Sequence, residues 1–415
     1  MTTYTETTRQ AVDSVGSLLA VVNLVRTGRA RTRPGLAQTL GLGRTVIAQR
    51  VDQAIDVGYL EESELGESTG GRAPRTLRFR SERGHIVVCA LGALHIRVGV
   101  SDLDGTILRS DHREWDIAQG PKATLQVAQD MIDSLLAGVD SSPIWGVAVG
   151  VPGPVDFATG RPVTPPIMPG WDAVDIRGAF ERKYHARTWV DNDVNLLALA
   201  ERARRGDDEH LDLIYLKVGT GIGAAFLFDG HLHRGVSGAA GDIGHTPVAN
   251  GDGLTCRCGK TDCLEATAAG WALIRDAQDA LDAGEASDLR PTSEARALVP
   301  EDLALAARRF DQLALRLVGR SAERAGAAVA VLVNALNPSV VVTGGAISSA
   351  NDAFTVPFAR AVHDAALPLT ARNLSIVHSQ ADRDEPIAGG NALVIEQLFE
   401  RSFSEWFADG QPTAP

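Results

Sequence analysis

The sequence predicts an α/β protein with two parts, a small helix-turn-helix head and a much larger body of two lobes. Residues 1–83 hold 12 arginines and 9 acidic residues, whereas the chain as a whole has a net charge of −12. The spacing of apolar residues changes from helical to alternating near residue 84. A strand, helix and strand order then occurs twice along the rest of the chain. A basic head on an acidic body is typical of a nucleic-acid-binding module joined to another kind of domain.

The composition limits the classes of protein that this chain can belong to. Its 415 residues are 44% hydrophobic and 22% charged, which predicts two or three globular domains. The first ten residues lack the basic and then apolar pattern of a signal peptide. The longest apolar stretch, residues 325–333, is too short to span a bilayer. With three of its four cysteines clustered, the chain is expected to be cytoplasmic and to have no membrane partner.

The head is expected to contain three helices. Apolar residues recur at helical spacing over residues 14–27, and Pro34 stands where a second helix would begin. Residues 41–43 form a glycine turn before a third helix over residues 44–57. Two helices around such a turn are typical of DNA-binding proteins, in which the second helix reads the bases. A helical bundle that binds a protein is the alternative.

Two strands are expected to flank the loop at residues 66–75 and to complete a winged helix. Gln49 can pair with adenine and Thr45 can reach a base edge, whereas arginines suit phosphates. Asp52 lies on the same helix face, where its charge would oppose DNA. The arginine in the loop either enters a minor groove or is a solvated charge. The predicted DNA-binding residues are Arg44, Thr45, Gln49, Arg50 and Arg72.

The body repeats one order of elements. Its first half contains three strands within residues 85–108, a helix over residues 122–137 and a strand over residues 144–149. Its second half contains three strands within residues 213–234 and a long helix over residues 303–336, with a further strand behind it. Two such halves predict an actin-like or hexokinase-like fold, in which a ligand lies between the lobes.

Three cysteines stand within eight residues, and a histidine precedes them. Three thiolates and one imidazole form a tetrahedral set that suits Zn²⁺ and has no open position for a catalytic water. A disulfide or unrelated core thiols are the alternatives. The predicted zinc ligands are His245, Cys256, Cys258 and Cys263.

The segment GVSGAAGDIGH at residues 235–245, followed by CRCGKTDCLE at residues 256–265, resembles the signature of the ROK family of repressors, open reading frames and sugar kinases. With a winged helix at residues 1–83, the chain resembles the repressor branch over nearly its whole length. The resemblance implies a first lobe at residues 84–194, with a C-terminal helix at 388–402 packed back on it. It implies a second lobe at residues 195–387, with the zinc loop and a dimer interface.

The resemblance also implies a sugar site. The implied sugar-binding residues are Asn192, Asp193, Asp242, His245 and Glu265. In the family's kinases, the aspartate that Asp193 matches is the general base, and the zinc-bound histidine also touches the sugar. Asp242 stands where the family usually has glutamate, so it is expected to reach another hydroxyl, to act through water or not to bind. A helix cap at residues 192–193 and a first-turn charge at Glu265 are the structural alternatives.

One phosphate loop of the kinases is altered. The family motif DxGxT, whose carboxylate helps to position the metal nucleotide, is replaced by Ala90-Leu-Gly92-Ala-Leu94, whereas a second glycine loop at residues 218–223 is intact. We therefore predict a regulator of the repressor kind with a catalytically inactive sensor. Its expected partners are operator DNA, a sugar or sugar phosphate, and a second copy of the chain. An ATP-dependent sugar kinase and a regulator controlled by a protein partner are the alternatives.

Overall fold

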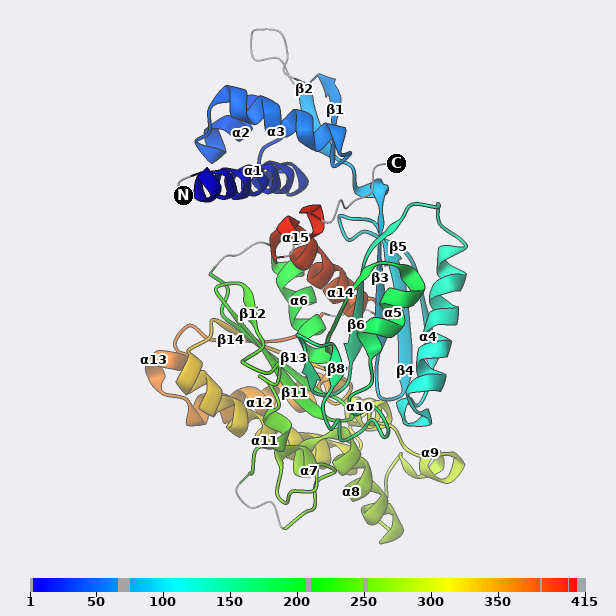
Figure 1. Ribbon diagram of the computed structural model, residues 1–415. Helices are drawn as coiled ribbons and strands as arrows, with labels where there is room; N and C mark the ends of the chain where they lie inside the picture. The colour runs from blue at the N-terminus through cyan, green and yellow to red at the C-terminus, as the bar shows by residue number, and fades with distance from the viewer. Residues whose placement is uncertain are drawn as a thin grey trace.

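A computed structural model of the chain describes residues 3–65, 75–206, 210–248, 253–380, 383–401 and 403–408. The head has the predicted three helices and two strands, and it lies at one end of the molecule (Figure 1). Its elements are α1 (Thr3–Arg26), α2 (Arg33–Leu40), α3 (Arg44–Asp56), β1 (Leu60–Leu65) and β2 (Arg75–Phe79). Strands β1 and β2 pair antiparallel, so the helix-turn-helix carries a wing.

Local chemistry accounts for the shape of the head. The Thr32 side chain caps α2 by accepting a hydrogen bond from Gly35 N at 3.1 Å. Gly41 ends the helix with a φ of 65°, a conformation that favours glycine. The predicted apolar face of α3 is buried, with Ile47 and Val51 in the core that the three helices share.

The body contains two five-stranded sheets with the same topology. In each sheet, three strands pair antiparallel, a fourth pairs parallel with the third, and a fifth pairs parallel with the fourth. The first sheet runs β5 (Ile107–Glu114), β4 (His95–Ser101), β3 (His85–Leu91), β6 (Ile144–Val151) and β9 (Arg187–Asn192). The second runs β12 (His231–His233), β11 (Ile222–Phe228), β10 (Leu213–Val218), β13 (Val340–Gly344) and β14 (Ser375–His378). This repeat confirms the predicted two-lobed actin-like fold.

Helices cover both sheets. The first sheet has α4 (Pro121–Leu136) and α5 (Ile176–Tyr184) on one face, and α6 (Asp193–Arg205) and α14 (Glu385–Glu396) on the other. The second lobe carries α7 (Leu264–Ala268), α8 (Gly270–Asp282), α9 (Arg290–Ala295), α10 (Pro300–Arg308), α11 (Gln312–Leu336), α12 (Asp352–Ala365) and α13 (Pro368–Ala371). A short hairpin of β7 (Val155–Asp156) and β8 (Arg161–Pro162) and a terminal α15 (Phe403–Ala408) complete the α-helices and β-strands of the described residues. None of the described helices is long and apolar enough to cross a bilayer.

Two details differ from the prediction. The single helix expected over residues 303–336 is wrong, because α10 ends at Arg308 and α11 begins at Gln312. Phe310 has a φ of 65° between them, and Asp311 starts a new helix by accepting a hydrogen bond from Ala314 N at 2.8 Å. The expected division after residue 194 falls inside α6, a continuous helix that contacts strands of both sheets.

The head is joined to the first lobe by an aromatic cluster, which we call the junction. Its members are Tyr59, Phe79, Trp145, Phe399 and Phe403. Ring centroids in the cluster lie 5.6 Å apart for Phe79 and Phe399 and 5.9 Å apart for Tyr59 and Trp145. The apolar core is continuous from the head through this cluster into the first lobe, and α15 lies beside α1 (Figure 1). The head therefore packs directly on the first lobe.

Candidate functional site

A cleft of about 1050 Å³ lies between the lobes. Its lining includes residues of β4 and the 152–154 loop from the first lobe, and residues of β10 and the 219–222 loop from the second. The structure brings all five of the implied sugar-binding residues to this cleft. They are Asn192, Asp193, Asp242, His245 and Glu265.

Asn192 and Asp193 stand where β9 passes into α6. Asn192 caps the helix, since its Oδ1 accepts a hydrogen bond from Val194 N at 2.8 Å and its Nδ2 donates to Gly153 O at 3.0 Å. The cap is therefore present, and the residue also faces the cleft. Asp193 Oδ2 forms an ion pair with Lys217 Nζ of β10, and these side chains are 14% and 27% exposed. The carboxylate that the resemblance implies as the kinase base is thus paired with a cation of the other lobe.

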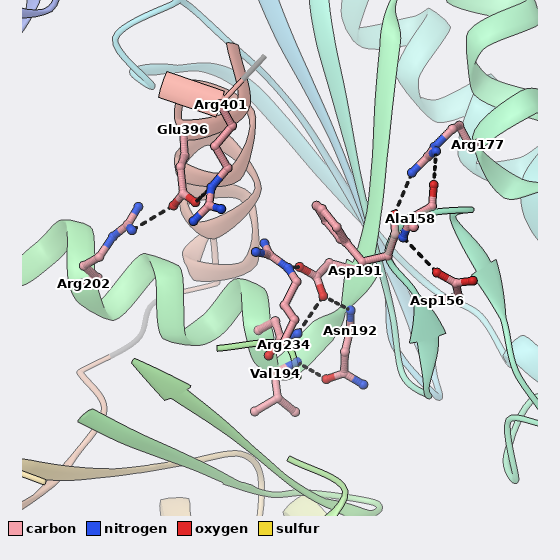
Figure 2. A network of polar contacts seen from close by, with 12 residues as sticks. Asp156, Ala158, Arg177, Asp191, Asn192, Val194, Arg202, Arg234, Glu396 and Arg401 are labelled. Atoms are coloured by element: carbon pink, nitrogen blue, oxygen red, sulfur yellow. Dashed lines mark hydrogen bonds and ion pairs between the residues drawn. The ribbon is translucent and has the colours of Figure 1, made fainter. Parts of the chain in front are cut away.

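The end of β9 also carries a buried ion pair between Asp191 and Arg234 (Figure 2). Asp191 is nearly inaccessible and accepts hydrogen bonds from Arg234 Nε at 2.8 Å and Asn195 Nδ2 at 2.6 Å. The guanidinium of Arg234 lies 4.0 Å from the ring centroid of Phe157 in the first lobe. Arg234 directly precedes the signature loop, so one residue connects that loop to the strand end that carries Asn192.

Two further carboxylates face the cleft from the second lobe. Burial raises the pKa of Asp242 above its ordinary value, with His245 acting against this effect and Glu265 adding to it. Glu265 is buried in the first turn of α7 and accepts hydrogen bonds from Ile222 N at 3.1 Å and Trp271 Nε1 at 3.4 Å. The expected first-turn charge is therefore present at Glu265, which also holds the start of β11.

The glycines of the signature loop permit close packing of the backbone. A Cβ atom on Gly238, Gly241 or Gly244 would lie within 2.3 Å of a carbonyl oxygen. Any side chain would collide there, and Gly238 and Gly241 also have positive φ values. The carbonyl groups belong, in the same order, to Val155, Ala224 and Ile222.

The histidine and the three clustered cysteines could hold a metal ion, because their ligand atoms all lie within 4.8 Å of one another. Cys258 Sγ and Cys263 Sγ are 3.7 Å apart, and Cys256 Sγ is 3.6 Å from His245 Nδ1. Tetrahedral zinc bond lengths would separate two sulfurs by about 3.8 Å and a sulfur from a nitrogen by about 3.6 Å. The residues present therefore fit the ion. All four cysteines of the chain are free, so the disulfide alternative is wrong for this structure.

The altered phosphate loop also lines the cleft. The His95 imidazole packs against Gly92 of this loop, where a Cβ would lie 2.4 Å from the imidazole Cε1. Burial lowers the pKa of His95 to about 4, and the charges of Lys217, Arg97 and His112 act in the same direction. His95, Arg97 and Lys217 were not predicted from the sequence. The only sequence signal was the rarity of lysine, which accounts for four of the 40 basic residues.

On the head, α3 presents Arg44, Thr45 and Gln49 to solvent. Arg50 is half-buried and donates hydrogen bonds to Ser17 Oγ at 2.9 Å and Gln53 Oε1 at 3.1 Å, so the structure ties it to α1 and α3. Arg72 lies outside the described residues.

The unfavourable charge expected at Asp52 is neutralised within the head. Its Oδ1 accepts a hydrogen bond from Arg33 Nη2 at 2.8 Å. Arg33 also pairs with Glu62 of β1 at 3.1 Å, which links α2, α3 and the wing. These partners are far apart in the sequence, so only the fold brings them together.

Two lobes of equal topology with a polar cleft between them, and a winged helix packed on the first lobe, define a protein of the actin-like sugar-kinase fold with an added head. The sequence profile of the ROK family matches residues 87–397. The chain belongs to the ROK family.

Two relatives that match over nine-tenths of the chain or more are regulators. The chain is 27% identical to a xylose repressor of Caldicellulosiruptor bescii over 390 residues, which cover 94% of this chain and 97% of the relative. It is 26% identical to the transcriptional dual regulator NagC of Escherichia coli, over 90% and 91% of the two chains. A glucokinase of Halalkalibacterium halodurans is 32% identical, over 68% of this chain and 88% of the kinase.

A solved structure shares the whole fold. It is a ROK family transcriptional regulator, described as a homologue of the Escherichia coli MLC protein, and it matches with a TM-score of 0.78 over 94% of this chain and 97% of its own. The two sequences are 22% identical, so this likeness concerns the fold.

Proposed function

We propose that this protein is a sugar-responsive transcriptional repressor that binds DNA through its head and a sugar in its cleft. The observation that carries the proposal is the similarity to repressors over more than nine-tenths of the chain, head included. The cleft supports it, because carboxylates, an amide and an imidazole are the groups that bind sugar hydroxyls. The exposed Arg44, Thr45 and Gln49 of α3 would contact DNA.

The cleft is proposed to bind its ligand without phosphoryl transfer. Transfer needs a positioned metal nucleotide and a carboxylate that takes the hydroxyl proton. Here Ala90 replaces the metal-positioning carboxylate, the His95 imidazole packs against Gly92 of the loop, and Lys217 forms an ion pair with Asp193. A coupled assay with ATP and a panel of hexoses should show no turnover, and robust phosphorylation would support the kinase alternative instead.

We propose that the ion in the Cys₃His site is Zn²⁺, with His245, Cys256, Cys258 and Cys263 as ligands. Zinc bound there would supply folding energy to the loop and no reactive water, because all four positions are filled. The nitrogen near Cys256 Sγ is His245 Nδ1, so this nitrogen would bind the metal and Nε2 would be left for a sugar hydroxyl.

Helix α6 offers a route from the cleft to the head. It begins at the sugar-binding pair, and its last turn carries Arg202, which pairs with Glu396 of α14 at 2.9 Å (Figure 2). Glu396 also pairs with Arg401 at 2.8 Å, and Phe399 of the junction lies between these two residues in the chain. We propose that sugar moves α6 and α14 together and so changes the placement of the head. This requires sugar to bind the two arrangements unequally.

Binding to the chain's own upstream region tests the function, with free sugars added in turn. Operator binding should require a pair of heads in a symmetric dimer and weaken steeply with salt. The variant Thr45→Ala/Gln49→Ala should lose sequence preference, whereas Gln126→Ala/Thr159→Ala on the body should keep it. Unchanged preference in the first variant would remove the assignment of α3. Ligand-independent DNA binding would favour control by a protein partner.

A further inference from the structure

The two lobes contact each other at a place outside the cleft lining, where the β7–β8 hairpin meets the signature loop. A Cβ on Gly238 would lie 2.3 Å from Val155 O and 3.3 Å from Phe157 N, so the loop and the hairpin approach backbone to backbone. Arg177 of α5 donates hydrogen bonds to Phe157 O at 2.8 Å and to the next carbonyl at 2.7 Å (Figure 2). The hairpin therefore joins α5 of the first lobe to the signature loop of the second.

Arg234, at the base of the signature loop, contacts both lobes. Its carbonyl oxygen accepts a hydrogen bond from Ala240 N at 3.1 Å, which closes the loop. Its guanidinium pairs with Asp191 at 2.8 Å and lies 4.0 Å from the ring centroid of Phe157, both in the first lobe. The side chains of Arg234 and Asp191 are 11% and 3% exposed. Since an unpaired buried charge is costly, each of these charges requires the other.

Asp191 connects this pair to the sugar-binding residues. Its Oδ1 accepts hydrogen bonds from Asn192 N at 2.8 Å and from Asn195 Nδ2 at 2.6 Å, and its Oδ2 accepts the one from Arg234. The carboxylate therefore holds the turn by which β9 passes into α6. Asn192 lines the cleft, whereas Arg234 and Asp191 do not. Arg234 therefore acts on a ligand through the residues that it holds.

A second ion pair also joins the lobes, and it differs in its exposure. Asp193 and Lys217 both line the cleft and are 14% and 27% exposed, so a ligand can compete for them. The pair of Arg234 and Asp191 is out of a ligand's reach and can persist when the cleft fills. The implied sugar-binding residues come from both lobes, and a ligand bound by both sets needs them within about 0.5 Å of the correct geometry. The buried pair is the one suited to set this spacing.

We propose that Arg234 is a positioning residue of the sugar site. Through Asp191 and Phe157 it holds the lobes at the spacing at which Asn192 of the first lobe and Asp242 of the second bind the same ligand. This inference rests on the proposed function and adds to it a residue that the ligand does not touch. The alternative is that the pair contributes to stability alone.

Two variants separate these roles. Arg234→Met removes the charge and leaves Asp191 buried without its cation, so it should lose both stability and the contact between the lobes. In Arg234→Met/Asp191→Asn no charge is left unpaired, and the amide oxygen at position 191 can still accept the hydrogen bonds from Asn192 and Asn195. Arg320→Met is the matched control, because Arg320 pairs with an aspartate of α8 inside the second lobe and outside the cleft lining.

Urea unfolding and hydrogen exchange of the full-length, metal-loaded protein, without ligand, give the first comparison. The double variant should recover most of the stability that Arg234→Met loses. Its amides in residues 153–162 and 235–245 should still exchange at least about tenfold faster than those of the wild type. Arg320→Met should exchange as the wild type does in both segments. Exchange at the wild-type rate in the double variant would overturn the proposal.

Calorimetric titration with a panel of pentoses and hexoses gives the second comparison. The sugar that binds the wild type should bind the double variant about tenfold to hundredfold more weakly, although the two proteins unfold at similar urea concentrations. Arg234→Lys keeps a cation for Asp191 and Phe157, so it should retain much of the affinity. Wild-type affinity in the double variant would show a role in stability alone and overturn the positioning role.

The same experiments separate this inference from the proposed function. A sugar that binds the wild type and the double variant equally, and releases DNA from both, would retain the repressor and overturn the positioning role. If no sugar of the panel binds the wild type, while exchange in the double variant stays fast, the contact between the lobes is retained and the sugar-binding function is wrong.

Discussion

Replacing Phe399 by leucine should uncouple the cleft from the head while both remain folded. Phe399 is fully buried in the junction. Its ring centroid lies 5.6 Å from that of Phe79 and 6.3 Å from that of Trp145. The guanidinium carbon of Arg26 lies over the same ring, 5.4 Å from its centroid. Two aromatic pairs contribute about 0.5–1.5 kcal/mol each and the cation–π contact about 0.5–1 kcal/mol, so the loss is about 1.5–4 kcal/mol in all. Leucine keeps most of the apolar contact area.

Two assays on the same protein measure this effect. Urea unfolding gives the lost stability, and titration of operator DNA with and without effector gives the coupling free energy. Phe180→Leu is the control, because Phe180 is also fully buried and contacts the ring of Tyr184 on the opposite face of the first sheet. It should reduce stability but leave the coupling intact. If Phe399→Leu loses stability and keeps the full effector response, the route through the junction is wrong.

Three further predictions follow from the fold and the cleft. Cys258→Ser should lower the zinc content below one ion per chain and weaken sugar binding, as elemental analysis and calorimetry would show; full zinc occupancy would contradict the ligand set. The pKa of His95 is about 4 in the folded chain and about 6.5 unfolded, so stability present above pH 6.5 is lost as the pH falls toward 4, by up to about 3 kcal/mol. Urea unfolding of His95→Gln should show a smaller loss over this interval, and an equal loss would contradict the buried neutral imidazole. Gly389→Ala should cost about 1–3 kcal/mol or more, because its Cβ would lie 1.9 Å from Leu196 O, whereas Gly319→Ala meets nothing within 4 Å and should be neutral or stabilising in thermal unfolding.

Much of the fold was predictable because apolar periodicity depends on local geometry. Alternation over residues 85–108 and 213–234 gave the antiparallel strands of both sheets, and the equal order of elements gave the two lobes. The break between α10 and α11 was not predictable in this way. The apolar pattern continues through it, and the break depends on the positive φ of Phe310 and the cap at Asp311.

The cleft was predictable only where its residues belong to a motif. Asn192, Asp193 and the signature loop were found from the sequence, and the structure gathers them at one place. Lys217 was missed because it lies in a strand and acquires its role when β10 meets the start of α6 from the other lobe. Arg234 was missed for the same reason, since its partner Asp191 is 43 residues away.

The glycines of the signature loop have a consequence for how such sequences evolve. Gly238, Gly241 and Gly244 are required by neighbouring carbonyl groups, whatever ligand the cleft receives. Asp242 stands among them and lines the cleft. Selection on packing can therefore preserve the pattern by which the family is recognised while ligand preference drifts at the positions between. The glycine pattern of the family then reflects close packing of the backbone. The ligand of each cleft depends on the side chains that line it.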